Sequence, residues 1–321
     1  MSAQTFNSTK AEAFAERFLG MMNSSALALM TSIGHRTELF DTLAELPPST
    51  SQQIADAAGL NERYVREWLG AMVTGGFVEY DARAKTYSLP AEHAAFLTRA
   101  SSPDNLAPFA QYIPLLGAVE DQIVDCFYKG GGVPYSQFKR FHEVMAEDSG
   151  QTVVAALEEH LLPLIPGLLE GLQQGLEVLD VGCGSGLALN KLARLFPNSR
   201  FSGYDFSEQA IARATDEAKR HRLANIQFHV KDVAKIDQVE KYDLITTFDA
   251  VHDQAHPDIV LRQIYQALRP DGIYLMQDIR AASDVAGNLA HPVAPFLYTI
   301  SCMHCMTVSL AAGGMGLGTM W

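Results

Sequence analysis

A glycine-rich stretch near the middle of the chain carries the residues best suited to chemistry. The apolar run 178–181 contains Asp180 and leads into Gly182, Cys183, Gly184 and Gly186, after which apolar residues recur at helical spacing. This pattern predicts a strand, a tight turn and a helix start. Glycines at such a turn permit positive φ angles and let a ligand lie against the backbone. A turn without any ligand is the alternative, because the dinucleotide fingerprint G-x-G-x-x-G would need a glycine at Leu187.

Two more acids follow at the ends of predicted strands. Asp205 ends the second strand and could accept both ribose hydroxyls of a nucleoside. Its alternative role is to cap the helix entered through Ser207. Asp232 follows the third apolar strand and could accept a hydrogen bond from an adenine amine, with Val233 beside the ring. The order of the three acids along the chain is more informative than any one of them.

The elements that must position these acids alternate between strand and helix from residue 176 onward. This alternation predicts a Rossmann-like, mostly parallel α/β sheet. The strands are expected at 177–181, 200–204, 226–230, 242–248 and 272–277, and the helices at 187–195, 208–221 and 257–268. Because ligands of such sheets lie at the carboxyl ends of the strands, near the switch point, the acids are expected to gather there.

The fourth and fifth strands add two further motifs. The fourth ends in Phe248 and is followed by His252, Asp253 and Gln254, and the turn 268–272 reads Leu-Arg-Pro-Asp-Gly. With the acid and glycine motif, these features resemble the class I S-adenosylmethionine-dependent methyltransferases over residues 176–278. The resemblance implies S-adenosylmethionine as cofactor and S-adenosylhomocysteine as product. The cofactor ligands it implies in this part of the chain are Asp180, Gly182, Cys183, Gly184, Gly186, Asp205, Phe206, Asp232, Val233 and Phe248.

The N-terminal hundred residues have a different pattern. Helical periodicity over residues 10–46 is followed by a helix, a glycine turn and a second helix over 53–70, and then by a hairpin near 77–89. This order is typical of a winged-helix unit. A DNA-reading role is disfavoured because glutamates offset the arginines of the second helix and the whole chain has a net charge of −13. We expect no nucleic-acid partner, and a homodimer formed through the N-terminal helices.

The winged-helix unit and the His252-Asp253 pair together indicate a smaller group within the class I methyltransferases. They are similar to small-molecule O-methyltransferases of plants and bacteria and to winged-helix methyltransferases of unassigned substrate. That family carries a His-Asp-Trp motif whose histidine deprotonates a substrate hydroxyl, and Gln254 stands here in place of the tryptophan. The resemblance implies His252 as the base and Asp278 as the acid that orients it.

Chemistry gives a reason for such a base, because a phenol with a pKa of about 10 is poorly ionised near neutral pH. A structural histidine or a cofactor contact is the alternative for His252. Tyr135 and Phe138 lie in a segment that resembles the family's helix covering the cofactor, and Tyr135 is expected to contact it. Ordinary helix packing is the alternative for both aromatic residues.

Length and composition bound the organisation of the chain. With 321 residues, of which 48% are hydrophobic, it has room for about two domains. We expect a helical and winged-helix domain over 1–100, a helical connector or cap over 101–172, and a methyltransferase domain over 173–321. Four cysteines do not suggest a disulfide framework, and the N-terminus lacks an apolar segment, so a cytoplasmic protein is expected.

The C-terminal segment raises three further questions. Cys302, His304 and Cys305 have the spacing of metal ligands, but a closed zinc site needs four, so no metal is expected. Residues 285–321 contain no Asp, Glu, Lys or Arg, yet prolines, histidines and glycines favour a buried helix over the active site rather than a membrane anchor. Class I methyltransferases usually end in an antiparallel strand pair, which we expect to be missing, through truncation or as a natural short form.

These observations favour methyl transfer from S-adenosylmethionine to a small-molecule acceptor, at a hydroxyl oxygen. The alternatives are a regulatory protein that binds S-adenosylmethionine without turnover, and a catalytically inactive short form that acts through protein partners.

Overall fold

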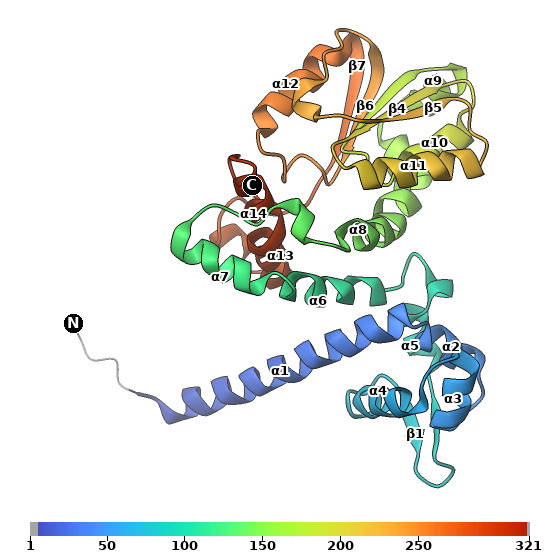
Figure 1. Ribbon diagram of the computed structural model, residues 1–321, viewed down its shortest axis with the longest axis vertical. Coiled ribbons are helices and arrows are strands. Elements are labelled where there is room, and N and C mark those ends of the chain that lie inside the picture. The colour runs from blue at the N-terminus through green and yellow to red at the C-terminus, as the bar shows by residue number, and fades with distance from the viewer. Residues whose placement is uncertain (1–5, 320–321) are drawn as a thin grey trace. The chain divides into compact units, whose positions relative to one another are not determined.

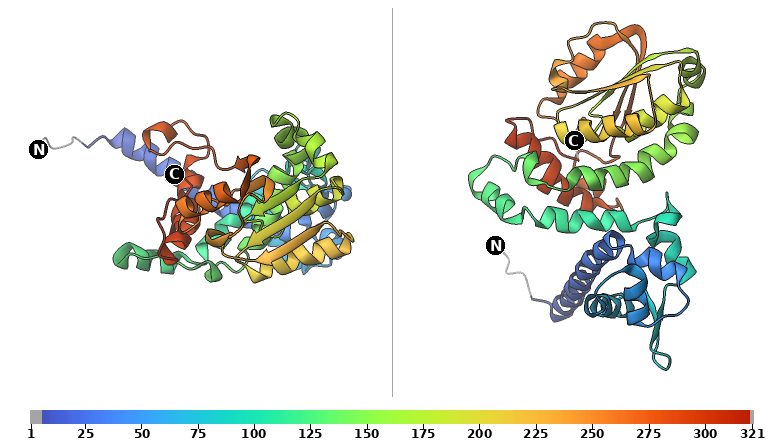
Figure 2. Two further views of the ribbon diagram at one scale, coloured as in Figure 1. Left: turned by 90° about the horizontal axis from the view of Figure 1, so that it is seen from above. Right: turned by 45° about the vertical axis from the view of Figure 1, so that its right-hand side comes forward.

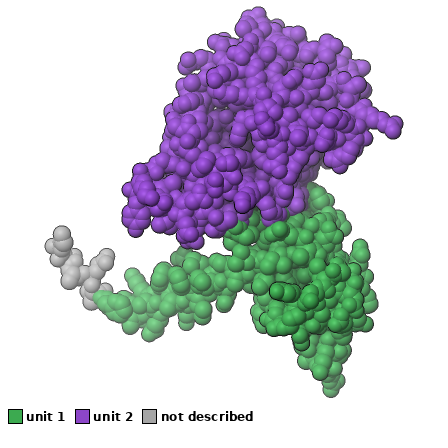
Figure 3. All heavy atoms as spheres, in the orientation of Figure 1, with its two compact units in different colours: residues 1–114 green, residues 115–321 purple. Residues whose placement is uncertain are grey.

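The computed structural model describes residues 6–319 and divides the chain into two compact units. They comprise residues 1–114 and residues 115–321 (Figure 3). The boundary falls inside the helical segment that the sequence predicted as a connector. Each unit has a hydrophobic core of its own, so each is described separately.

The N-terminal unit contains the predicted helix-turn-helix and hairpin. Thr50 and Gln53 form a capping box that starts the first of the two helices, Gly59 ends it in the left-handed conformation, and Asn61 caps the second. The elements are α1 (Ser8–Arg36), α2 (Leu39–Glu45), α3 (Ser51–Ala58), α4 (Glu62–Thr74), β1 (Glu79–Asp81), β2 (Thr86–Ser88), α5 (Ala91–Leu97), η1 (Arg99–Ser101) and η2 (Ala107–Gln111), and α6 (Tyr112–Gly117) crosses the boundary. The antiparallel pair β1–β2 forms the wing.

The core of this unit lies between α2, α3 and α4, and side chains of α1 pack against it. Trp68 packs edge-on against Phe40 with ring centroids 5.2 Å apart, and its indole nitrogen donates to the backbone oxygen of Met30 over 2.8 Å. Gly34 permits this packing because a Cβ there would lie 2.5 Å from the Trp68 ring. On the exposed side of α4, Arg63 pairs with Glu67 and Arg66 with Glu62. The arginines of the second helix are therefore neutralised by their own helix.

The second unit carries the sheet and the helices around it. Its helices before the sheet are α7 (Glu120–Lys129), η3 (Tyr135–Gln137), α8 (Phe141–Ser149), η4 (Gly150–Val154), η5 (Leu157–Leu161), η6 (Leu162–Leu164) and α9 (Leu168–Gln174). The alternating part consists of β3 (Glu177–Val181), α10 (Leu187–Leu195), β4 (Arg200–Asp205), α11 (Glu208–Arg220), β5 (Ile226–Val230), η7 (Val233–Lys235), β6 (Tyr242–Phe248), α12 (Pro257–Ala267) and β7 (Leu268–Gln277). The chain continues into η8 (Ala286–Asn288), α13 (Ala294–Ile300), η9 (Ser301–Cys305) and α14 (Met306–Ala311).

The five strands form one parallel sheet in the order β5-β4-β3-β6-β7 (Figure 1). The chain runs outward from β3 to β5 and then returns to the other side of β3 with β6. The switch point of the sheet therefore lies between β3 and β6, where ligands of open α/β sheets bind. Among the residues that the structure describes, β7 is hydrogen-bonded to β6 alone and no antiparallel strand pair follows it.

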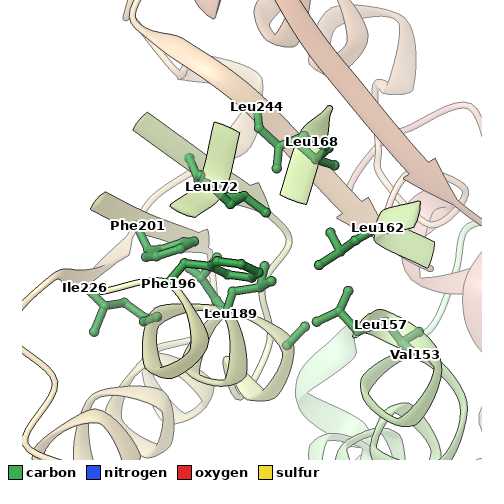
Figure 4. Close-up of a cluster of buried hydrophobic side chains, with 14 of the residues drawn as sticks. Val153, Leu157, Leu162, Leu168, Leu172, Leu189, Phe196, Phe201, Ile226 and Leu244 are labelled. Atoms are coloured by element: carbon green, nitrogen blue, oxygen red, sulfur yellow. The ribbon is translucent and has the colours of Figure 1, made fainter. Parts of the chain in front are cut away.

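Helices cover both faces of the sheet (Figure 2). Side chains of β3 alternate between them: Val178 faces the cluster formed with α9 and α10, whereas Leu179 and Val181 face α12 and η7. Figure 4 shows the first of these clusters, in which leucines of α9 and η5 meet Phe196 and Phe201. Burial on both faces fixes the register of β3, and with it the position of the loop that follows.

The C-terminal segment is helical, as the sequence predicted. The stretch Ala294–Ala311 is long and apolar enough to cross a membrane by length and composition alone, a test that core helices of soluble proteins also pass, and 39% of it is buried inside the protein. Its buried polar side chains contact other parts of the second unit: Thr307 accepts a hydrogen bond from the backbone of Val133, and Ser309 donates to the backbone oxygen of Gln254.

Candidate functional site

A pocket lies at the switch point, over the carboxyl ends of β3, β4 and β6. All but one of the residues predicted to bind the cofactor line it, namely Tyr135, Asp180, Gly182, Cys183, Gly184, Gly186, Asp205, Phe206, Val233 and Phe248. The exception is Asp232, whose carboxylate accepts from the backbone of Ala234 and pairs with Lys235 on the exposed side of η7. Its neighbour Val233 is the residue that reaches the pocket wall.

The glycine loop has the backbone geometry that its sequence requires. Gly182, Gly184 and Gly186 have φ angles of 75°, 51° and 68°, which side chains rarely adopt. A Cβ at Gly186 would lie 2.7 Å from Ala214 and Phe228, whereas a Cβ at Gly184 would meet nothing within 4 Å. Gly186 is therefore needed for packing, and Gly184 leaves space open at the pocket.

One strand-end acid holds this loop in place, and another links the strands beside it. The Asp205 carboxylate accepts hydrogen bonds from the backbone N–H groups of Gly184 at 2.9 Å and Ser207 at 2.8 Å. The helix cap considered for Asp205 is instead supplied by Ser207, whose hydroxyl accepts from Ala210. Asp180 accepts from the Thr246 hydroxyl over 2.8 Å, which links the ends of β3 and β6 at the switch point.

Burial gives the pocket unusual acid chemistry. Burial raises the pKa of Asp180 to about 7, with the Thr246 hydrogen bond opposing the shift and Asp205 adding to it. Burial likewise raises the pKa of Asp249 and of Asp253 to about 6 each, and it raises the pKa of Asp205. Several carboxyls that share one desolvated pocket favour a ligand with positive charge and hydrogen-bond donors.

Residues before the sheet cover the pocket as a lid formed by η3 and α8. Tyr135, Phe141 and His142 line the pocket from this side, and Tyr135 packs edge-on against Phe206 with centroids 5.3 Å apart. The Tyr135 hydroxyl lies 3.3 Å from Nδ1 of His142. Glu143 joins the lid to α11 through an ion pair with Arg213.

The predicted catalytic pair is assembled beside the pocket. Nδ1 of His252 lies 2.7 Å from a carboxylate oxygen of Asp278, and both side chains are buried. Asp278 is the first residue after β7, and its carboxylate also accepts from the backbone of Ile279. Ala250 and Asp253, on either side of His252, line the pocket itself. The carboxylate of Asp278 thus fixes the His252 ring through Nδ1, which leaves Nε2 for a second interaction.

That second interaction of His252 is made by Cys305, a residue of the π-helical turn η9. A side-chain hydrogen bond joins the two, and both are buried. Burial alone would lower the pKa of His252, but the hydrogen bonds with Asp278 and Cys305 outweigh it and raise the pKa above its ordinary value. Burial raises the pKa of the Cys305 thiol, with His252 opposing the shift.

The cysteine and histidine residues of this turn do not gather as metal ligands. Within residues 6–319, no three His, Cys, Asp or Glu side chains are arranged to hold a metal ion, and all four cysteines are free. The ring of His304 is instead stacked on Phe141 of the lid, with centroids 3.5 Å apart.

Several pocket residues were missed by reasoning from the sequence. Asp249 and Asp253, which follow the predicted Phe248 and His252 in the chain, line the pocket, and His142 and Met145 line it from the lid. A signal for the acids was present, because both lie at the end of a strand next to the switch point. Asp249 has a φ of 48°, a strained conformation that functional sites often contain and that the sequence does not reveal.

Comparisons with known proteins agree with this description of the two units. Residues 25–99 match the family model of the Rv2258c-like winged HTH domain, and residues 172–305 match that of a methyltransferase domain. Human N-acetylserotonin methyltransferase, solved in complex with S-adenosylmethionine, is similar in fold, with a TM-score of 0.65 and 18% identity over 95% of this chain and 88% of that one. The mitomycin 7-O-methyltransferase MmcR is similar at a TM-score of 0.66 and 18% identity, over 94% of this chain and 89% of that one.

Curated relatives are similar over shorter stretches. The malonyl-[acyl-carrier protein] O-methyltransferase of Bacillus cereus is 28% identical over 148 residues, 46% of this chain and 49% of the relative. The fatty-acid O-methyltransferase of Mycolicibacterium smegmatis is 29% identical over 113 residues, 35% of this chain and 40% of the relative. The chain thus spans half or less of the length of these relatives. Residues 25–99 are therefore similar to a winged HTH domain and residues 172–305 to a methyltransferase domain, and the fold is that of the solved methyltransferases named above.

Proposed function

We propose that this protein transfers a methyl group from S-adenosylmethionine to a hydroxyl oxygen of a small molecule. The observation that carries the proposal is the pairing of two features at one switch point. A glycine loop held by Asp205 opens onto an acid-lined pocket, and a buried His252–Asp278 pair stands directly beside it. The first feature suits the cofactor and the second suits the removal of a proton from the acceptor.

The residues present fit the proposed cofactor. In this proposal the methionine part of the cofactor would lie against the backbone in the open space at Gly184, and Asp205 would accept hydrogen bonds from the ribose hydroxyls. Phe206 and Val233 supply apolar surface for the adenine ring. When bound, S-adenosylmethionine supplies a methyl group on a positively charged sulfur, which the surrounding carboxyls favour over a neutral ligand.

The role proposed for His252 follows from its hydrogen bonds. Asp278 holds Nδ1, so Nε2 is the nitrogen that would take a proton from an acceptor hydroxyl, which would replace Cys305 as its partner. The deprotonated acceptor oxygen would be the nucleophile for the methyl group that a bound cofactor would supply, with S-adenosylhomocysteine as the leaving group, and positioning would supply most of the rate enhancement. Asp278 would stabilise the imidazolium that results.

A hydroxyl acceptor suits this site better than a carboxylate acceptor. Two curated relatives, by contrast, are named as O-methyltransferases of malonyl-[acyl-carrier protein] and of fatty acids. A carboxylate is already ionised at neutral pH and needs no base. The described residues that line the pocket include Asp180, Asp205, Asp249 and Asp253 and no lysine or arginine. A negatively charged acceptor would therefore be repelled where a neutral hydroxyl would not.

The test is a transfer assay with S-adenosylmethionine labelled in the methyl group. The whole chain is incubated with a set of phenols and alcohols and with matched benzoic and fatty acids. The proposal expects labelled ethers from members of the hydroxyl set. Labelled esters without ethers would contradict the acceptor class, and no transfer to either set by a protein that binds S-adenosylhomocysteine would contradict turnover.

We also propose that the protein is a cytoplasmic homodimer joined through its N-terminal helices. Support comes from α1, on which seven large apolar side chains are exposed, a pattern typical of interaction surfaces. They are Phe14, Phe18, Leu19, Met21, Met22, Leu29 and Ile33. Light scattering should give the mass of a dimer for the wild type and for Glu16→Lys as control, and the mass of a monomer for Phe18→Glu with Met22→Glu. A monomeric wild type at micromolar concentration would contradict the proposal.

A further inference from the structure

His304 is a buried histidine whose hydrogen-bonding capacity is unused. Its side chain has no exposed surface, and neither Nδ1 nor Nε2 has a hydrogen-bond partner. Burial lowers the pKa of His304 to about 3, with His252 and His142 adding to the shift, so the ring is neutral and offers one donor and one acceptor. Leaving both nitrogens unpaired costs free energy that an apolar ring of similar size would avoid. Such a group needs an explanation in the function of the site.

Three aromatic rings of the lid surround this histidine. Phe141 stacks on it nearly parallel, with centroids 3.5 Å apart and planes 7° apart. Phe138 and Tyr135 approach it edge to face, with centroids 4.7 Å and 5.5 Å away. These rings fix the plane of the imidazole but cannot satisfy its nitrogens. Tyr135 and Phe141 also line the cofactor pocket, so His304 lies directly behind the pocket's lid.

The same turn of helix faces the catalytic pair. Cys305, the next residue, is hydrogen-bonded to His252, and Ser309, one turn further on, donates to the backbone oxygen of Gln254 over 2.9 Å. The turn η9 is π-helical, a local irregularity that is frequent at functional sites. His304 and His252 therefore border the same region of the protein, one from the C-terminal helix and one from the end of β6.

We propose that His304 determines acceptor specificity by hydrogen-bonding a second polar group on the acceptor, beside the hydroxyl that His252 deprotonates. The inference rests on the proposed function and sharpens it. The acceptor is then an aromatic ring with two neighbouring polar substituents, because Tyr135, Phe138 and Phe141 offer flat apolar surfaces and His304 a neutral donor and acceptor. Entry of that ring requires the lid to move, since Phe141 covers His304.

The experiment compares catechol, which has two neighbouring hydroxyls, with phenol, which has one. Two variants are measured beside the wild type: His304→Phe keeps a flat ring without nitrogens, and His304→Gln restores a donor and an acceptor. S-adenosylhomocysteine binding and the melting temperature are recorded for each. We expect the wild type to favour catechol in kcat/KM by roughly 10–100-fold, because phenol would leave the buried imidazole without a hydrogen-bond partner.

His304→Phe should bring that ratio close to unity while leaving S-adenosylhomocysteine affinity unchanged, and His304→Gln should restore part of it. The melting temperature of His304→Phe should equal or exceed that of the wild type, because two unpaired polar atoms are removed. An unchanged ratio, a melting temperature lowered by the Phe variant, or no reaction of either ring despite S-adenosylhomocysteine binding would overturn the inference. A wild type that binds no S-adenosylhomocysteine would instead overturn the proposed function beneath it.

Discussion

The two sides of the pocket are built in different ways. The cofactor side is a contiguous loop, Gly182 to Gly186, held by Asp205 at the end of the neighbouring strand β4, and most of its hydrogen bonds involve the backbone. The acceptor side is assembled from side chains of distant segments: the lid, the ends of β6 and β7, and the π-helical turn. On the cofactor side, backbone geometry therefore determines which ligand can bind. On the acceptor side, a few side chains determine it.

The difference separates binding from turnover. Substitutions on the acceptor side should change the rate of methyl transfer and leave cofactor affinity alone. Substitutions on the cofactor side should change affinity. The predictions below test this division, from the largest expected effect to the smallest.

Replacing the base should have the largest effect. His252→Ala should lower turnover by about 10²–10⁴-fold, because the acceptor hydroxyl would lose its proton acceptor. The affinity for S-adenosylhomocysteine, measured by calorimetry, should stay the same. His256→Ala, an exposed histidine at the start of α12, is the matched control. Wild-type turnover in His252→Ala would rule out the role of base, and a large loss of affinity would break the division between the two sides.

Replacing the acid that orients the base should have a smaller effect with a distinct pH signature. The pKa of His252 is raised by Asp278 and Cys305, so turnover should climb with pH as the base loses its proton. Asp278→Asn removes the carboxylate, which lowers the pKa of His252 and moves the rising limb of the pH profile to lower pH. The maximal rate should fall by about 10–100-fold, the effect of losing one hydrogen bond to a charged group. A rising limb that does not move would show that Asp278 does not act on His252.

On the cofactor side, Asp205→Ala should weaken S-adenosylhomocysteine binding by roughly 1–3 kcal/mol. The carboxylate would be lost both to the ribose hydroxyls and to the backbone of Gly184, which it holds in place. Calorimetry checks the affinity, and turnover at saturating S-adenosylmethionine should change little. Asp232→Ala, at the exposed acid that does not line the pocket, is the control and should bind as the wild type does. Equal losses in both variants would count against the loop geometry described above.

The smallest expected effect is on the preference of the pocket for a positively charged ligand. The pKa values of Asp249 and Asp253 are raised to about 6 and that of Asp180 to about 7, so these groups are protonated at pH 5 and ionised above pH 8. S-adenosylmethionine has a positive sulfur and S-adenosylhomocysteine does not. The affinity ratio of the two should therefore rise by about 3–10-fold between pH 5 and pH 8.

Asp253→Asn should flatten this rise, which competition binding at several pH values would measure. A ratio independent of pH in the wild type would mean that the carboxyls do not sense the sulfur.

Local sequence patterns predict much of the fold and the cofactor side. The strand Glu177–Val181 is marked by an apolar run that ends in an acid, and the helix Leu187–Leu195 by the spacing of its apolar residues, and both have these bounds in the structure. The helix-turn-helix is equally readable, because Thr50, Gly59 and Asn61 mark its caps. Such features depend on neighbours within a few residues.

The acceptor side is far less readable from the sequence. The stacking of His304 on Phe141 joins residues more than 160 positions apart in the chain. No local sequence pattern predicts the π-helical turn at 301–305. Asp232 is a separate case. An acid in the expected order along the chain faces solvent, and Val233 beside it faces the pocket, because orientation within a short 3₁₀ turn is set by packing against the sheet.

The central claim is that the pocket at the switch point binds the methyl donor, and calorimetry with S-adenosylhomocysteine tests it most directly. The whole chain is titrated beside Gly184→Val, whose side chain would enter the open space at the pocket, with circular dichroism to verify that the variant is folded. The account predicts micromolar binding of a single molecule by the wild type and none by the folded variant. No binding by the wild type, or equal binding by both, would contradict it.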